Sequence, residues 1–496
     1  MTINELITIC EPTARSGKKP DRLGKLHQDS RRVKQGDLFI AVRGIQSDGH
    51  DFIDDAVSNG ASIIITEKPV TITDPDVFCL QVPSTRLLVG PLAQAFHGHP
   101  ASRMAVIGVT GTNGKTTVTT LIWQLLQQMG VKSGLLGTVM KQIGDEPLES
   151  RLTTSDPIEL ADDLRKMADA GCQAVAMEVS SHALDQERTR GVHWKVGAFT
   201  NLSHDHLDYH DNMDSYASAK QKLFQSLDPS ASAIINGDDP YAKTIREGCR
   251  AAVIDFSFQE EAAVQCKLFE SGPNGLRIVV DDVEIHSPLA GRFNAYNVAE
   301  AWLICRELGY DASELARLMK YCSGAPGRME KVTAESNESS TPTVFVDYAH
   351  TPDALHNVAS TLYELKKPDQ PLIILFGCGG DRDRDKRPAM AKAAEQWGDQ
   401  LVITSDNPRS EDPEEIIREI EAGITGNKNR VSLPDRKEAI YHAVLTAPED
   451  AIILIAGKGH ETWQEVDGKR HPFDDRDVAR KALKAYSLDM KTGRAD

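Results

Sequence analysis

The sequence lacks several features that define common classes of protein. Its eight cysteines are scattered without a CxxC pair, which indicates reduced thiols and a cytosolic setting. The N-terminal residues show no basic region followed by an apolar core, so we expect no signal peptide and a cytoplasmic location. No apolar run approaches the roughly 18 residues that a membrane-spanning helix needs. The chain also has no low-complexity tract and no fixed-period repeat.

An excess of positive charge is missing as well. Lys and Arg number 56 against 73 Asp and Glu, which gives a formal net charge of −17. This charge argues against nucleic acid or an anionic membrane as a partner, and an anionic ligand must be captured by local positive charge. The expected partners are small-molecule substrates, the expected oligomeric state is a monomer, and no membrane insertion is expected. The length of 496 residues predicts about three domains.

Residues 105–117 and the segment after them have the pattern of a phosphate-binding loop. An apolar, β-branched run predicts a buried strand, the segment TGTNGKTT follows it, and a later apolar stripe predicts a helix. The glycines let backbone N–H groups turn onto phosphate oxygens, while Lys115 can reach the terminal phosphates and Thr116 can hold Mg²⁺. The usual glycine six residues before the lysine is Val109 here, and Gly108 is the nearer fit. An ordinary tight turn is the alternative.

Residues from about 101 to 328 alternate predicted strands and helices, which favours a mainly parallel sheet flanked by helices. One predicted strand, residues 173–178, ends in the carboxylate of Glu178, where a Mg²⁺ ligand belongs. A helix-capping or solvated glutamate is the alternative. Residues 201–210 hold three His and two Asp within seven residues, which can bind a metal or touch phosphates. A polar loop with incidental histidines is an equal alternative there.

The helix predicted over residues 215–227 carries Lys220 on its apolar face, whereas Lys222 falls outside that stripe. A lysine in such a position must snorkel, pair with an acid or lose its charge, and snorkelling is the commoner outcome. The sharper hypothesis is a modified lysine. A carbamate on the nitrogen would turn the cation into an anionic oxygen ligand beside Mg²⁺.

Two further segments carry polar candidates. Residues 1 to about 100 mix short strands and helices, and their polar run at 28–32 either receives a polar ligand or forms a solvated turn. Residues 291–297 open a predicted helix, in which Asn294 is a candidate N-cap and Asn297 can read a base edge through its amide.

Residues from about 332 onward form a second α/β unit, after a linker that ends at Arg328. Four predicted strands of this unit are each followed at once by a polar cluster. In an open α/β sheet the carboxyl ends of the strands share one rim, where ligands bind. We therefore expect Arg382, Arg409 and Glu461 to converge, although solvated loop charges are the alternative for each cluster singly.

In this order the motifs resemble the Mur ligase family over essentially the whole chain. The motifs that carry the resemblance are TGTNGKTT (110–117), EVSSH (178–182), NLSHDHLDYH (201–210), YASAK (216–220), GRFNAYN (291–297), PGRME (326–330), DYAHTPDAL (347–355), GGDRDRDKRP (379–388), DNPR (406–409) and GKGHE (457–461). The resemblance implies an α/β protein of three domains. These are a small α/β N-terminal domain that binds a UDP-linked substrate (1–100), a central P-loop ATPase-type parallel sheet that binds ATP (101–328), and a C-terminal Rossmann-like domain that binds an amino acid (329–496).

The activity implied by the resemblance is an ATP-dependent amide ligation of peptidoglycan synthesis. ATP phosphorylates the D-glutamyl carboxylate of a UDP-N-acetylmuramoyl-dipeptide, and an incoming amine captures the acyl phosphate. DNPR resembles the motif of members that add meso-2,6-diaminopimelate, and Arg409 can pair bidentately with the distal carboxylate that lysine lacks. A lysine-adding ligase, a P-loop kinase that stops at a phosphorylated product and an ATP-sensing module are the alternatives.

The resemblance also implies roles for individual residues. The ATP contacts are Gly111, Thr112, Asn113, Gly114, Lys115, Thr116, Thr117, Asn294, Asn297 and Arg328. One Mg²⁺ has the ligands Thr116 and Glu178, a second has His206 and a carbamylated Lys220, and the catalytic residues are Lys115, Glu178, His206, Lys220, Arg328 and Asp347. The UDP-substrate contacts are Gln28, Ser30, Ile45, Gln46, Ser47, Thr153, Thr154, Ser180, Gln186 and Arg188, and the diaminopimelate contacts are Arg382, Asp406, Asn407, Pro408, Arg409, Gly457 and Glu461. Two positions depart from the family pattern: Leu152 stands where asparagine is common, and Arg384-Asp385 where Lys-Gly is common.

Overall fold

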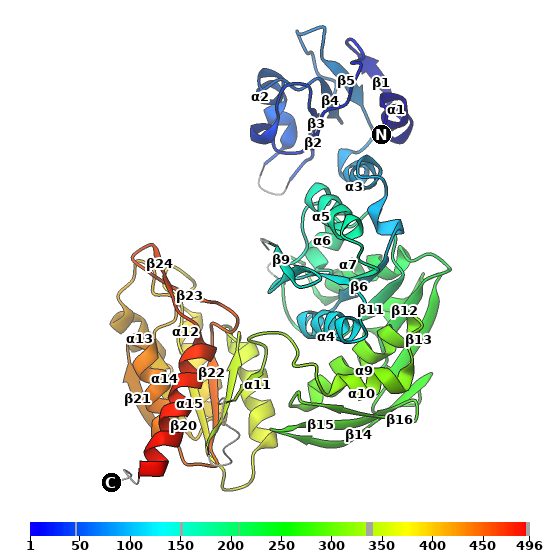
Figure 1. Ribbon diagram of the computed structural model, residues 1–496. Helices are drawn as coiled ribbons and strands as arrows, with labels where there is room; N and C mark the ends of the chain where they lie inside the picture. The colour runs from blue at the N-terminus through cyan, green and yellow to red at the C-terminus, as the bar shows by residue number, and fades with distance from the viewer. Residues whose placement is uncertain (45–46, 149–151, 208, 334–340, 493–496) are drawn as a thin grey trace. The chain divides into compact units, whose positions relative to one another are not determined.

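The computed structural model describes residues 1–44, 47–148, 152–207, 209–333 and 341–492, with side chains up to residue 488 (Figure 1). The chain divides into two compact units, residues 1–265 with 300–315 and residues 266–299 with 316–496. Both units mix helices and strands, which confirms the α/β class predicted from the sequence.

The first sheet, formed by described residues of the N-terminal segment, has five short strands in the order β1-β5-β4-β3-β2. All neighbouring pairs are parallel except β1 and β5. The strands are β1 (Ala14–Ser16), β2 (Leu26–His27), β3 (Leu38–Ile40), β4 (Ile63–Thr66) and β5 (Phe78–Gln81), and the helices are α1 (Ile3–Cys10), α2 (Ile53–Ser58) and α3 (Thr85–Phe96). Because successive strand residues point to opposite faces, Ile63 and Ile65 join one apolar core and Ile64 joins another.

The central sheet, counted over the described residues, has eleven strands in the order β16-β15-β14-β13-β12-β11-β6-β10-β7-β8-β9. Neighbouring strands are parallel from β14 to β7, so the predicted parallel core is confirmed. Antiparallel pairs extend the sheet at both ends, through β15 and β16 on one side and β8 and β9 on the other. The strands are β6 (Ala105–Thr110), β7 (Ser133–Leu136), β8 (Lys141–Ile143), β9 (Glu146–Leu148), β10 (Ala174–Glu178), β11 (Val196–Phe199), β12 (Ser232–Asn236), β13 (Ala252–Ser257), β14 (Val264–Gly272), β15 (Gly275–Val280) and β16 (Val283–Ser287). The helices are α4 (Lys115–Gln128), α5 (Pro157–Asp169), α6 (Ser181–Asp185), α7 (Met213–Gln225), α8 (Ala242–Arg246), α9 (Arg292–Glu307) and α10 (Ala312–Met319).

The C-terminal sheet has six strands among the described residues, in the order β17-β18-β22-β19-β20-β21, and only the edge strand β17 is antiparallel. The strands are β17 (Glu330–Val332), β18 (Thr343–Asp347), β19 (Leu372–Phe376), β20 (Gln400–Thr404), β21 (Asn429–Leu433) and β22 (Ile452–Ala456), with a separate hairpin of β23 (Trp463–Val466) and β24 (Lys469–Pro472). The helices are α11 (Pro352–Leu365), α12 (Lys386–Trp397), α13 (Pro413–Glu421), α14 (Arg436–Leu445) and α15 (Asp475–Thr492). Helices α11, α12 and α13 pack on one face of the sheet, and α14 and α15 pack on the other (Figure 1).

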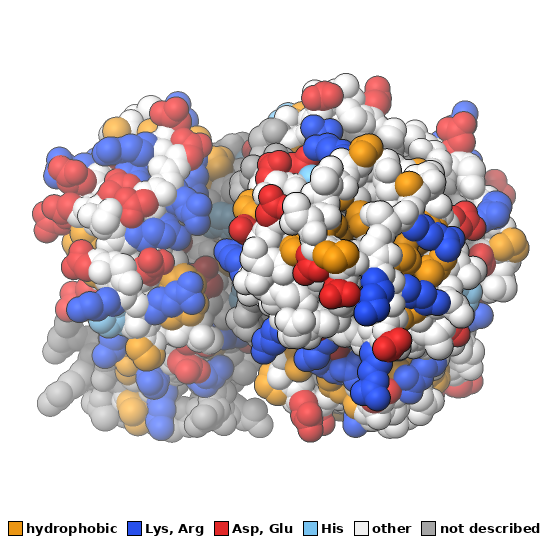
Figure 2. Space-filling view, turned by 90° about the horizontal axis from the view of Figure 1, so that it is seen from above, with side chains coloured by type: hydrophobic (Ala, Val, Ile, Leu, Met, Phe, Trp, Pro, Cys, Tyr) orange, Lys and Arg blue, Asp and Glu red, His pale blue; other side chains and the backbone are white. Residues whose placement is uncertain are grey.

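Three further observations concern the surface charges, the cysteines and the helices. Acidic and basic side chains are interspersed over the face shown in Figure 2. All eight cysteines are free thiols. Among the described residues, none of the helices combines the length and the apolar character that a membrane crossing requires.

A fully buried ion pair joins helices and strand ends in the second unit. Arg436 and Asp475 have side chains with 0% exposure, and the guanidinium donates to the two carboxylate oxygens at 2.8 and 2.7 Å. The same guanidinium donates to the carbonyl oxygens of Ser405 and Ala456, at the ends of β20 and β22. The pair therefore fixes the rim of the sheet where the predicted polar clusters begin.

We expect the variant Arg436→Met to lower the stability of the second unit by about 3–5 kcal/mol, because Asp475 would stay buried without its cation. Chemical denaturation followed by circular dichroism measures this loss. Arg480→Met is the matched control, since Arg480 forms an exposed pair with Asp477 that contributes about 0–1 kcal/mol. Equal denaturation midpoints for the two variants would contradict the structural role of the buried pair.

Candidate functional site

The predicted phosphate loop connects β6 to α4 in the conformation that such a loop requires. Gly111 and Gly114 have positive φ angles of 152° and 88°, a region that residues with a side chain rarely adopt. Lys115 is the first residue of α4, and its Nζ donates to the carbonyl oxygens of Gly111 at 2.9 Å and Thr112 at 2.7 Å. The lysine therefore lies over the loop, and Thr117 is buried in the first turn of the helix.

Gly108, the nearer fit to the usual spacing, has a packing role. A Cβ at this position would lie 2.8 Å from the ring of Trp194. Glycine at position 108 thus allows the indole to pack directly on β6, and it does not shape the loop.

Residues that follow β11 hold the phosphate loop in place. The Thr200 hydroxyl donates to the carbonyl oxygen of Asn113 at 2.6 Å, and the Asn201 side chain both accepts from the Asn113 N–H at 3.0 Å and donates to its carbonyl at 3.1 Å. A Cβ on Gly111 would come within 1.9 Å of the Thr200 hydroxyl oxygen, so the approach requires glycine. Sequence reasoning misses this role of Thr200 and Asn201, and their position directly after a strand is the only signal.

Glu178 ends β10 beside the phosphate loop, as predicted, and its carboxylate is buried. The Thr116 hydroxyl donates to Oε2 at 3.1 Å, and Thr138 donates to Oε1 through its N–H at 2.8 Å and to Oε2 through its hydroxyl at 3.2 Å. A Cβ on Gly137 would lie 2.4 Å from Oε1, which explains glycine there. The oxygen donors of Thr116 and Glu178 are the type that Mg²⁺ prefers, so this pair fits the predicted metal site. Thr138 is a neighbour that the sequence does not reveal.

Lys220 is 1% exposed on α7, so the commoner outcome, snorkelling, is wrong for this residue. Its Nζ donates to the carbonyl oxygen of Gly111 at 2.7 Å and lies 4.5 Å from the centre of the Tyr216 ring. Burial, and then the positive charge of Lys115, lower the pKa of Lys220 well below its ordinary value. The amine therefore loses its proton more readily than the amine of a solvent-exposed lysine does. Helix α7 begins two residues earlier than predicted because the Asn212 side chain caps it by accepting from the Ser215 N–H.

The histidine-rich segment does not gather into a metal site within the described residues. His206 has a positive φ of 55°, and its ring centre lies 5.0 Å from that of His182 and 6.0 Å from that of Tyr216. His210 is buried, and its Nε2 lies 3.0 Å from the Ser181 hydroxyl. No group of three or more His, Cys, Asp or Glu in the described part of the chain is arranged to hold a metal, and residue 208 lies outside that part.

The residues predicted to contact the muramoyl-dipeptide form one cluster beside Glu178. The hydroxyl oxygens of Thr153 and Thr138 lie 2.9 Å apart, and the Thr154 hydroxyl donates to the Glu178 carbonyl oxygen at 2.9 Å. Ser180, whose N–H donates to the Thr154 hydroxyl, caps α6. Two further members, Gln186 and Arg188, hydrogen-bond to each other, and the arginine also donates to the Thr154 carbonyl at 3.1 Å. Leu152, which replaces a common asparagine, is exposed.

The predicted uridine contacts follow two neighbouring parallel strands of the first sheet. Gln28 comes directly after β2, and Ser30 is buried at the start of a short 3₁₀ turn. Ser47 lies in the loop after β3, where its carbonyl oxygen accepts from Gly44 N–H at 2.9 Å. Ile45 and Gln46 lie outside the described residues.

The N-cap role predicted for Asn294 is wrong. Helix α9 begins at Arg292, and the Asn294 side chain inside it donates to the Ala290 carbonyl oxygen at 2.8 Å. The Asn297 side chain donates to Asn294 Oδ1 at 2.9 Å, and both amides are buried. The amide of Asn294 thus bonds backwards along the chain and orients the amide of Asn297.

Arg328 and Asp347 lie close together in the second unit. Asp347 ends β18 and accepts hydrogen bonds from the N–H groups of Met329 at 2.6 Å and Ala349 at 2.8 Å. Burial raises the pKa of Asp347, and the charge of Arg328 opposes that shift. The guanidinium of Arg328 lies 4.9 Å from the centre of the Tyr348 ring, and its buried Nε has no hydrogen-bond partner among the described residues.

The polar clusters of the C-terminal sheet line a single cavity of about 490 Å³. The predicted convergence of Arg382, Arg409 and Glu461 is therefore confirmed. The cavity is lined by Tyr348, His350, Gly377, Cys378, Gly379, Arg382, Lys386, Asp406, Asn407, Arg409, Gly457, Glu461 and Trp463. Of the seven residues predicted to bind diaminopimelate, only Pro408 is missing from this lining. Arginine at position 384, where lysine is common in the family, leaves Arg382 in the cavity lining. Arg384 itself pairs with Glu419 on α13.

The cavity wall contains carboxylates held by buried cations. Lys458 has a side chain with 0% exposure, and its Nζ donates to Glu461 Oε2 at 2.9 Å and to Asn407 Oδ1 at 3.1 Å. The Asn407 amide also donates to Glu461 Oε2 at 3.0 Å. Burial raises the pKa of Asp406, while Arg436 and Lys458 counter that shift. Acidic and basic groups thus share one space, which suits a ligand that carries both carboxylates and ammonium groups.

Comparison with known proteins identifies the family. The Mur ligase middle domain matches residues 109–305, the glutamate ligase domain of Mur ligases matches residues 327–459, and the Mur ligase family catalytic domain matches residues 25–106. A UDP-N-acetylmuramoyl-L-alanyl-D-glutamate–2,6-diaminopimelate ligase from Geobacillus thermodenitrificans is 42% identical over 94% of this chain and 96% of its own. The chain belongs to the Mur ligase family.

Two further relatives support the conclusion that the chain is a Mur ligase. A protein of the same name from Cytophaga hutchinsonii is 41% identical over 97% of this chain and 99% of its own. A solved structure of a UDP-N-acetylmuramoyl-L-alanyl-D-glutamate–2,6-diaminopimelate ligase has a TM-score of 0.70 and 33% identity, and the match covers 93% of this chain and 95% of that one. The three-domain α/β fold predicted for a Mur ligase is confirmed.

We expect Asn201→Ala to weaken ADP binding about tenfold, because the variant loses two hydrogen bonds that hold Asn113, each worth roughly 0.5–1.5 kcal/mol. Isothermal titration with ADP and Mg²⁺ measures the affinity. The control is Asn274→Ala, since Asn274 is exposed and bonds only to Lys331 among the described residues. An unchanged affinity in Asn201→Ala would contradict the role of residue 201 in shaping the loop.

Proposed function

We propose that the chain is the ATP-dependent ligase that adds meso-2,6-diaminopimelate to UDP-N-acetylmuramoyl-L-alanyl-D-glutamate in peptidoglycan synthesis. Relatives of 42% and 41% identity carry this name. The observation that carries the proposal is the cavity of the second unit, where Arg382 and Arg409 share one space with Asp406 and Glu461. Such a set of charges fits an amino acid with two carboxylates and two ammonium groups.

The three substrates are assigned to three domains. Residues 1–100 bind the uridine part of the UDP-linked substrate. Residues 101–328 bind ATP and the muramoyl-dipeptide part, and residues 329–496 bind the amino acid. The matched family regions at 25–106, 109–305 and 327–459 support this division.

The proposed reaction has two chemical steps. The γ-phosphoryl group of ATP moves to the D-glutamyl carboxylate, which yields ADP and an acyl phosphate. The amine of diaminopimelate then attacks the acyl carbon, loses a proton and expels inorganic phosphate as the amide forms. Lys115 stabilises negative charge on the transferred phosphoryl group, because such transfer depends on positioning and electrostatics. Thr116 and Glu178 would hold Mg²⁺, which neutralises phosphate charge when bound.

Lys220 is proposed to carry a carbamate. The neutral amine attacks the carbon of CO₂ and loses a proton, which gives an N–COO⁻ group. The burial of Lys220 supports the neutral amine that this reaction needs, because it disfavours an ammonium ion. The nearby positive charge of Lys115 disfavours an ammonium ion and favours an anion at the same place. With His206, the carbamate would supply ligands for a second Mg²⁺.

The remaining roles follow the family pattern. Asn294 and Asn297 contact the adenine, and Arg328 and Asp347 are further nucleotide contacts. The buried Nε of Arg328 supports this role, since it has no partner in the described part of the chain and leaves a donor for a ligand. The proposed contacts to the UDP-linked substrate are Gln28, Ser30, Ile45, Gln46, Ser47, Thr153, Thr154, Ser180, Gln186 and Arg188.

Selection of diaminopimelate over lysine is assigned to the basic side of the cavity. Arg409 binds the distal carboxylate, Arg382 binds a carboxylate as well, and Gly457 and Glu461 bind the amino-acid end. Lysine has no distal carboxylate, so its binding leaves donors of the partly buried Arg409 guanidinium without an acceptor, at a cost of roughly 1–3 kcal/mol.

A panel of amine substrates tests the function. Given ATP, Mg²⁺ and the UDP-dipeptide, the purified protein is expected to release phosphate with meso-diaminopimelate at least tenfold more efficiently than with lysine. Equal rates with lysine would favour the lysine-adding ligase. Phosphoryl transfer from ATP that needs no amine would favour a kinase, and no turnover with any amine would favour an ATP-sensing module.

The carbamate has its own test. Protein equilibrated with ¹³C-bicarbonate is expected to show one carbamate ¹³C resonance that is absent from Lys220→Ala. That variant should lose turnover, and added bicarbonate should not restore it. As the pH falls through the lowered pKa of Lys220, the amine becomes protonated, so the resonance and the activity should decline together. Lys222→Ala is the matched control, because Lys222 pairs with Asp185 on the exposed side of α7. Near-normal turnover of Lys220→Ala would remove the carbamate from the proposal.

A further inference from the structure

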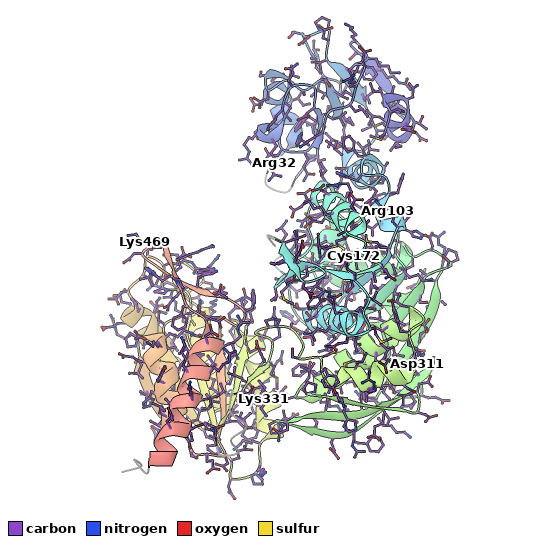
Figure 3. All side chains as sticks on the ribbon, viewed as in Figure 1. Arg32, Arg103, Cys172, Asp311, Lys331 and Lys469 are labelled. Atoms are coloured by element: carbon purple, nitrogen blue, oxygen red, sulfur yellow. The ribbon has the colours of Figure 1, made fainter. Side chains whose placement is uncertain are left out.

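The β23–β24 hairpin runs beside the cavity segment that contains Arg409. Two hydrogen bonds link residues 464 and 465 to that segment: Gln464 Nε2 donates to the Asp406 carbonyl oxygen at 2.6 Å, and the Glu465 N–H donates to Asn407 Oδ1 at 2.9 Å. Arg409 itself donates through its N–H to the Glu465 carbonyl oxygen at 3.0 Å. Figure 1 shows the hairpin at one end of the C-terminal sheet, and Lys469, the first residue of β24, marks it in Figure 3.

The guanidinium of Arg409 is held from two sides. Its Nη1 donates to the Gly380 carbonyl oxygen at 2.6 Å, and its Nε lies 3.6 Å from Glu465 Oε2. Both side chains are partly buried, with exposures of 21% for Arg409 and 25% for Glu465. A guanidinium has five N–H donors in a rigid plane, so these two contacts fix its orientation and leave donors for a ligand.

The backbone around Arg409 leaves little freedom for another arrangement. Arg409 has a positive φ of 53°, and a Cβ on Gly380 would lie 1.9 Å from the Pro408 carbonyl oxygen. A Cβ on Gly379 would lie 3.0 Å from Arg409 Nη1. The glycine loop at 379–380 therefore packs directly on the segment that contains Arg409. Glu465 contacts the guanidinium from another side.

We propose that Glu465 is a positioning residue that determines amino-acid specificity. Its carboxylate orients the Arg409 guanidinium toward the cavity, so that the cavity selects an amino acid with a second, distal carboxylate. This inference rests on the proposed function. Glu465 lies outside both DNPR and GKGHE, so no motif indicates it.

The test compares KM and kcat for meso-diaminopimelate and for lysine, with phosphate release as the readout. Glu465→Gln keeps the backbone contacts and the size of the side chain but removes the charge. Its KM for diaminopimelate is expected to rise about tenfold, equivalent to about 1.4 kcal/mol, with kcat within about twofold and the KM for lysine unchanged. Asp467→Asn is the matched control, because it removes one charge from an exposed position of the same hairpin and should behave as wild type.

A double-mutant cycle separates positioning from a general structural effect. In an Arg409→Lys background, which lacks the planar donor set, Glu465→Gln should have no further effect on KM for diaminopimelate. An equal rise in KM for both amino acids, an effect that persists in the Arg409→Lys background, or no effect at all would overturn the role of Glu465 while the proposed function stands. A wild-type protein that does not add diaminopimelate would overturn the proposed function, and the inference with it.

Discussion

The register of three parallel strands is the constraint on which the phosphate-loop site depends. β6 lies between β10 and β11, with Glu178 opposite Val109 and Phe199 opposite Thr110. Because strand side chains alternate between the two faces of a sheet, a slip of one residue would turn Glu178 away from the loop and displace Thr200 from it. The buried apolar side chains on these strands fix the register. The hydrophobic core of the first unit therefore sets the position of each polar group that contacts the loop.

Buried charge organises the second unit. The side chains of Arg387, Arg436 and Lys458 have 0% exposure, and each lies next to a carboxylate. Removing a cation from water is costly unless a partner and further hydrogen bonds compensate, so each pair also fixes the loops that supply its partners. For Arg387 these include the loop around Gly379, whose carbonyl oxygen accepts from the guanidinium at 3.2 Å. The walls of the cavity are thus shaped by ion pairs whose cations are fully buried.

Much of this arrangement can be predicted from the sequence, and the failures have physical reasons. Residues 372–376 and 452–456 are continuous apolar runs between polar segments, so their strands and the polar rim after them follow directly. Asn294 misleads because an asparagine that suits an N-cap can also bond back to residue 290 from inside a helix. The burial and the pKa of Lys220 depend on which residues cover its helix, and the periodicity of the sequence carries no information about those residues. Thr138, Asn201 and Glu465 are ordinary polar residues, and their importance comes from partners that only the fold brings near.

The close contact between Gly380 and Pro408 has a consequence for how such enzymes diverge. The segment 405–409 is enclosed by the glycine loop on one side, where Pro408 leaves no room for a Cβ on Gly380, and on the other side by the hairpin, to which it is hydrogen-bonded. If the four-residue DNPR motif alone were moved into a related protein, its arginine would lack the glycine loop and the hairpin that orient the guanidinium. New amino-acid preferences should arise when the glycine loop, segment 405–409 and the β23–β24 hairpin are exchanged together. Exchange of all three segments is therefore a more productive route for engineering than single substitutions.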